Sequence, residues 1–63
     1  MRLSDPAIDL VVGELFAAEG VRVRASSRRQ VQLVCRDFVR LELEAGSALD
    51  AAEERLIAVI RRG

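Results

Sequence analysis

Few side chains in this chain could do chemistry, and Cys35 is the strongest nucleophile among them. The sequence contains no His, Lys, Tyr or Trp. It therefore lacks the commonest general base, the amine that forms Schiff bases and the phenol. Cys35 lies among apolar residues with no His to activate it, so we expect a buried structural thiol. An enzyme based on Cys35 is the least favoured function.

The acidic residues predict neither a catalytic pair nor a metal site. Glu42 and Glu44 are two residues apart on a predicted helix, so their side chains do not face each other. Glu53 and Glu54 are adjacent at an exposed helix start and predict a solvated face. The four glycines are isolated, which argues against a glycine-rich phosphate loop. We therefore predict no catalytic residue, no metal and no cofactor.

Four arginines are the candidates for contact with nucleic acid. Arg22 and Arg24 alternate with valines in Val21–Ala25, and a period of two is typical of a short strand. Such a strand would need the same strand from a second chain. The simpler interpretation is an extended connector. Arg28 and Arg29 follow at the next helix start, although ten Arg against ten acids leave no net charge to attract nucleic acid.

This region resembles the ribbon-helix-helix repressors, in which one strand is followed by two helices. The resemblance implies a dimer whose paired strands enter the major groove of DNA. It implies that Arg22 and Arg24 contact bases or phosphates, with Ser27 and Arg28 near a phosphate. Two features depart from the family: a regular helix precedes the segment, and the middle helix is longer.

The predicted helix near residues 27–45 organises the rest of the chain. Its apolar residues recur every three or four positions in two rows, which are Val31, Val34, Phe38, Leu41 and Ala45, and Val31, Cys35, Val39 and Leu43. Together the rows cover roughly half of the helix circumference, so we expect other helices on two sides. Ser27 and Gln30 have the spacing of a capping box, and Gly46 is placed to end the helix.

A first helix is predicted near residues 5–19. Ser4 or Asp5 caps it, Pro6 lies in its first turn, and Gly20 ends it with Val21 folding back. Its apolar stripe comprises Ile8, Val11, Val12, Leu15 and Phe16. Gly13, at the flank of that stripe, suggests the close approach of another helix.

A last helix is predicted near residues 48–62, with Ser47 or Asp50 as its cap. Its apolar stripe comprises Leu49, Ala52, Leu56 and Val59, widened by Ile57 and Ile60. The three helices predict an all-α fold, a small three-helix up-down bundle that forms one domain over residues 1–63.

A second resemblance covers most of the chain. The start Met1-Arg2-Leu3, the run Leu41–Ala45, and Leu49-Asp50-Ala51 followed by Glu54 resemble the small bacterial family called domain of unknown function 507. The resemblance implies an all-helical fold and supplies no activity.

The length of 63 residues, with only two aromatic side chains, predicts a marginal core. We therefore expect a homo-oligomer or a protein partner. Leu10 and Leu33 point out of polar faces and Glu42 points into an apolar one, so these three residues are the candidate partner or dimer surface. No signal peptide or transmembrane run is visible, which predicts a cytoplasmic protein with no membrane contact.

The favoured function is a non-catalytic helical module for protein–protein interaction that associates with itself. The alternative is a dimeric DNA-binding regulator that uses Val21–Ala25 as its ribbon, with contacts from Arg22, Arg24, Arg28 and Arg29.

Overall fold

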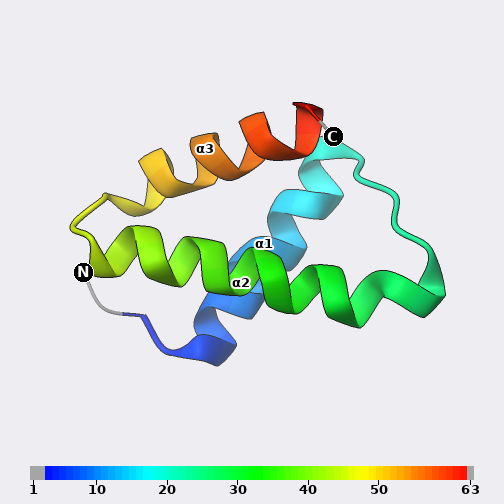
Figure 1. Cartoon of the computed structure of the whole chain (residues 1–63), viewed down its shortest axis with the longest axis horizontal. Helices are drawn as coiled ribbons and strands as arrows, with labels where there is room; N and C mark the ends of the chain where they lie inside the picture. The colour runs from blue at the N-terminus through cyan, green and yellow to red at the C-terminus, as the bar shows by residue number, and fades with distance from the viewer. Residues whose placement is uncertain (1–2, 63) are drawn as a thin grey trace.

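Three α-helices form the structure, a computed structural model that describes residues 3–62. They are α1 (Asp5–Glu19), α2 (Arg28–Glu44) and α3 (Leu49–Arg62), and one turn of 3₁₀-helix, η1 (Ala25–Ser27), precedes α2. None of the described residues lies in a strand. The predicted all-α class is therefore confirmed. Figure 1 shows α2 and α3 side by side and antiparallel, with α1 crossing behind α2.

Local signals set both ends of α1. The Ser4 Oγ accepts a hydrogen bond from the Ala7 amide at 3.3 Å, so Ser4 rather than Asp5 is the cap. At the other end, Gly20 adopts a left-handed conformation with a φ of 68°. The Val21 amide then donates to the Phe16 carbonyl at 2.9 Å. This is the predicted Schellman-type closure.

The start of α2 differs from the prediction, because no capping box forms. The side chain of Ser27 makes no capping hydrogen bond, and its φ of −108° and ψ of −4° are near-helical. A capping residue needs an extended backbone. The preceding turn, in which the Ser27 amide donates to the Arg24 carbonyl at 2.9 Å, holds Ser27 out of that conformation.

In the turn between α2 and α3, the end of α2 matches the prediction, whereas the side-chain contact of Ser47 does not. Gly46 has a φ of 100°, and the Ser47 amide donates to the Glu42 carbonyl at 3.0 Å. This closes α2 as expected. The Ser47 hydroxyl, predicted to cap α3, instead donates to Glu42 Oε1 at 3.1 Å. Asp50 accepts only from the next amide, that of Ala51, at 2.9 Å.

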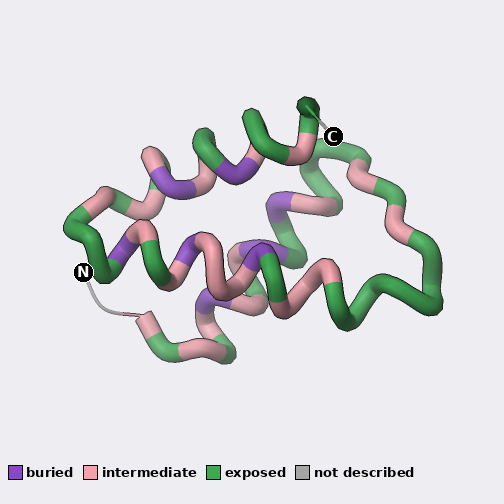
Figure 2. Tube along the Cα trace, in the orientation of Figure 1, coloured by how far each residue is buried: buried purple, intermediate pink, exposed green. Residues whose placement is uncertain are grey.

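The core lies where α1 and α3 meet α2. Its buried side chains come from one face of each helix (Figure 2) and are Ile8, Val12, Leu15, Cys35, Val39, Leu43, Ala52 and Leu56. Within residues 3–62, α2 packs extensively against both other helices, whereas α1 and α3 barely touch. The expectation that α2 is covered on two sides is thus confirmed.

Polar contacts tie the three helices together at the edges of this core. The Gln32 side chain donates to the Asp9 carbonyl of α1 at 2.9 Å. Arg61, at the end of α3, donates to Glu19, at the end of α1, at 2.8 Å. Arg55 of α3 donates to Glu42 of α2. These contacts join α1 to α2, α1 to α3 and α2 to α3.

Two expectations about packing are wrong. Gly13 was expected beside another helix, but a Cβ built there would meet nothing within 4 Å. Val59 was placed on the buried stripe of α3 and is 52% exposed. Neither Gly13 nor Val59 has another of the described helices packed beside it, because α1 and α3 each pack on α2 and hardly on each other.

Candidate functional site

Cys35 is buried in the core, as predicted, and is poorly placed for catalysis. Burial raises the pKa of its thiol above the ordinary value, because desolvation penalises the thiolate. The thiolate is the reactive form. Among residues 3–62 there is also no cluster of three or more Cys, Asp or Glu side chains that could hold a metal ion. Within the described part of the chain, Cys35 is therefore a buried thiol that belongs to no metal-ligand cluster.

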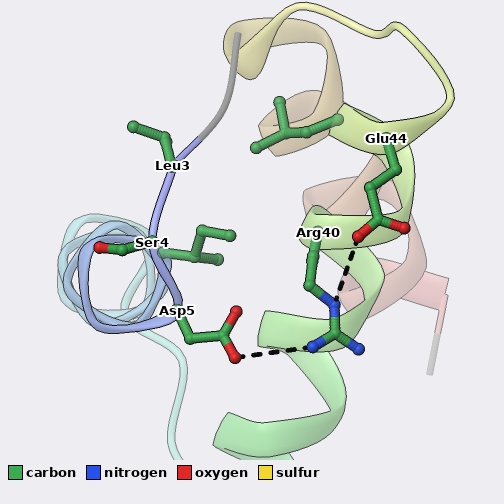
Figure 3. Close-up of a pocket in the computed structure, with 7 residues that line it drawn as sticks. Leu3, Ser4, Asp5, Arg40 and Glu44 are labelled. Carbon is green, nitrogen blue, oxygen red and sulfur yellow. Dashed lines mark ion pairs between the residues drawn. The ribbon is translucent and has the colours of Figure 1, made fainter.

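A hollow of about 940 Å³ lies between the start of α1 and the end of α2. Figure 3 shows Arg40 at its rim between two carboxylates. Its guanidinium lies 3.6 Å from Asp5 and 3.9 Å from Glu44, and a third carboxylate, that of Asp37, is 3.2 Å away. Among the described residues, Arg40 is the one cation that lines this hollow, and it is already paired with carboxylates, so the hollow offers no free positive charge to an anionic ligand. The ion pair between Arg40 and Asp5 instead joins α2 to α1.

The three predicted partner-surface residues lie apart from one another. Leu10 is 68% exposed, on the face of α1 turned away from the core. Leu33 is half-buried and lines a hollow of about 460 Å³ beside Asp9 and Arg36. Glu42 is half-buried and accepts from both Ser47 and Arg55. The three residues therefore have different surroundings: Leu10 is open to solvent, Leu33 lines the hollow beside Asp9, and Glu42 is held by polar contacts.

A different apolar surface is open on α2. Val34 is 60% exposed and Leu41 is 59% exposed, although their row was expected to be covered. Phe38, between them in the same row, is half-buried and packs against the core on one side. Residues at i, i+4 and i+7 lie along one helix face. The other row of α2 is the one that the core buries.

Val59 of α3 is a further exposed apolar side chain, at 52%. The contact between Glu42 and Arg55 sets the register of the antiparallel pair α2 and α3. Phe38 lies one turn before Glu42, and Val59 lies one turn after Arg55, so the two are level. We call Val34, Phe38, Leu41 and Val59 the exposed strip. In the sequence, these four residues belong to apolar rows that periodicity predicts to be buried. Periodicity does not show that no other helix within the described residues covers them.

The four candidate nucleic-acid residues lie close together along the chain and are all exposed. Arg22 and Arg24 point outward from an extended connector, and the alternating Val21 and Val23 are half-buried, lining a hollow against α1. The predicted alternation is thus confirmed, while the connector forms no strand within the described chain. None of Arg22, Arg24, Arg28 and Arg29 forms an ion pair with a described residue.

Charge is segregated along the long axis of the molecule, which α2 follows (Figure 1). The basic end holds the start of α2, the connector and the end of α3, with Arg22, Arg24, Arg28, Arg29, Arg61 and Arg62 against Glu19, which pairs with Arg61. The acidic end holds the end of α2 and the start of α3, with Glu42, Glu44, Asp50, Glu53 and Glu54 against Arg55, which pairs with Glu42. The exposed strip lies between the two ends.

None of the helices within residues 3–62 has the length and apolar character needed to cross a membrane. Met1 and Arg2, which carry part of the resemblance to domain of unknown function 507, lie outside the described residues. Both family resemblances stay predictions. Comparison of the chain with protein-family models, with curated proteins and with solved structures finds no match.

Proposed function

We propose that this chain is a non-catalytic helical module for protein–protein interaction that associates with itself through the exposed strip. The observation that carries the proposal is the open apolar row on α2, where Val34 and Leu41 are each about 60% exposed. Apolar side chains gathered on one face favour burial against another protein surface.

The total surface of the chain supports the same proposal. The chain exposes 4695 Å². A compact monomer of 7.0 kDa exposes about 4,000 Å². The excess of roughly 700 Å² approaches the ~800 Å² that each partner buries in a stable interface. A partner that covered this excess would bring the chain to an ordinary burial.

Sedimentation equilibrium across a concentration series tests this proposal. We expect the wild-type chain to be heavier than a monomer at high concentration. Val34→Gln and Leu41→Gln should each raise the dissociation constant more than about tenfold, because each removes a buried apolar side chain from both copies. Leu10→Gln is the matched control, since Leu10 is equally exposed but lies off the strip.

The outcomes of this experiment are distinct. A wild-type chain that stays monomeric at every concentration would refute self-association. Association that Leu10→Gln weakens as much as Val34→Gln does would show that the exposed strip is not the binding face. Circular dichroism on each variant checks that the helices are intact.

Nucleic-acid binding is a second candidate function, and one observation favours it. Arg22 and Arg24 face outward from the connector while the intervening valines face α1, as a basic ribbon would require. Fluorescence anisotropy with duplex DNA should then show an affinity that falls with salt and with Arg22→Ala or Arg24→Ala. Arg55→Ala, which removes an arginine in the middle of α3 away from the connector, is the control. Indifference to DNA at low salt would exclude this function.

A further inference from the structure

The exposed strip has a geometry that suits a second copy of the same chain. Val34 and Leu41 are seven residues apart on α2, which corresponds to about 10 Å along the helix axis. A twofold axis across α2 beside Phe38 would set Val34 of each copy opposite Leu41 of the other. An isologous dimer needs a self-complementary patch of this kind.

The charge distribution selects the direction of the second helix. The basic end and the acidic end lie on either side of the exposed strip (Figure 1). In an antiparallel pair, the basic end of one copy lies over the acidic end of the other. In a parallel pair, like charges lie over like charges, which opposes association. Charges at the rim of an interface mainly set orientation and salt dependence.

We propose that a second copy of this chain covers the exposed strip, with the two α2 helices antiparallel and related by a twofold axis beside Phe38. This inference rests on the proposed function, because it names the partner and its orientation. The chain has no net charge, so a strongly acidic or strongly basic partner has no advantage over a second copy. A second copy, which carries one basic and one acidic end of its own, matches both charged ends at once.

Disulfide trapping tests the orientation directly. Cys35 is first replaced by Ala, so that each chain carries a single thiol. Chains with Val34→Cys are then mixed with chains with Leu41→Cys and oxidised. A disulfide needs Cα atoms about 5.5–6 Å apart, so the antiparallel dimer should join position 34 of one chain to position 41 of the other. Mass spectrometry of the linked peptides identifies the pair.

Three outcomes are possible, and each decides something. Predominant linkage of position 34 to position 41 supports the antiparallel dimer. Linkage of 34 to 34 and 41 to 41 in chains that do associate overturns the orientation and leaves the proposed function standing. Linkage no faster than that of a Leu10→Cys control, in chains that sediment as monomers, overturns both.

Charge reversal gives an independent readout of the same orientation. Arg28→Glu with Arg29→Glu lowers the positive charge of the basic end, which keeps Arg22, Arg24, Arg61 and Arg62. In the antiparallel dimer this should raise the dissociation constant on the order of tenfold at low salt.

In a parallel dimer, the same substitutions would change the dissociation constant in the opposite direction. In such a dimer, lowering the positive charge of the basic end would relieve repulsion, and association would strengthen. That result, or wild-type association that strengthens as salt is added, would overturn the antiparallel arrangement. Circular dichroism separates either result from loss of the fold.

Discussion

At the scale of single residues, Gly13 shows how an apparent packing device can be an open surface. It lies within α1, and the space beside its Cα is empty to 4 Å. Glycine inside a helix costs about 1 kcal/mol relative to alanine, because its backbone is freer in the unfolded chain. With no neighbour to clash, nothing offsets that cost.

We therefore predict that Gly13→Ala raises the free energy of unfolding by about 1 kcal/mol. Urea denaturation followed by circular dichroism measures the change. Gly20→Ala is the control: its site is equally open but has a φ of 68°, so alanine there should destabilise the fold. A destabilised Gly13→Ala chain would mean that α1 has a partner at this position.

The second residue-scale prediction concerns the thiol of Cys35. Its pKa is raised from the ordinary value of 9.0 by burial. The folded chain therefore keeps this proton over a range of pH where the unfolded chain loses it. The stability due to the neutral thiol is complete below the unfolded-state pKa and is lost as pH rises through the folded-state pKa.

The free energy of unfolding should thus decline above about pH 9 in the wild type and decline less in Cys35→Ala. The comparison is clean because the chain has no Lys or Tyr to titrate in the same range. Urea denaturation at several pH values measures it. Equal slopes for the two chains would show that Cys35 is solvated rather than buried.

At the scale of the elements, the starts of α1 and α2 are built differently. Ser4 caps α1 through its hydroxyl, whereas Ser27 precedes α2 without a capping bond. We predict that Ser4→Ala lowers the free energy of unfolding by about 1 kcal/mol, while Ser27→Ala changes it little. The two serines are a matched pair, and denaturation curves for both variants provide the measurement. A comparable loss in Ser27→Ala would show that the capping box forms after all.

At the scale of the whole molecule, α2 has one covered row and one open row. Val39 is fully buried and Val34 is 60% exposed. Val39→Ala leaves a cavity in a small core and should cost about 2 kcal/mol of stability, a large part of what a chain of this size has. Val34→Ala should leave the stability of the monomer nearly unchanged and weaken association.

Two measurements separate these effects. Denaturation at concentrations below the dissociation constant reports the stability of the monomer, and sedimentation reports association. A large loss of monomer stability in Val34→Ala would mean that the exposed strip is covered from within the chain.

Much of the fold follows from the sequence because helix boundaries depend on neighbours along the chain. The predicted helices near residues 5–19, 27–45 and 48–62 match α1, α2 and α3 to within one residue at each end. Ser4, Gly20 and Gly46 act locally, through one hydroxyl and two left-handed backbones. A period of three to four apolar residues likewise depends only on helix geometry.

The tertiary structure alone decides which side chains remain exposed. Two apolar rows on α2 are equally apolar in the sequence, and only the crossing of α1 and the placement of α3 leave Val34 and Leu41 open. Glu42 appears misplaced in the sequence until the turn brings Ser47 and Arg55 to it. The basic end and the acidic end each combine residues from different helices, so they exist only once the helices are packed together. These properties depend on contacts between residues far apart in the chain, which periodicity and spacing do not specify.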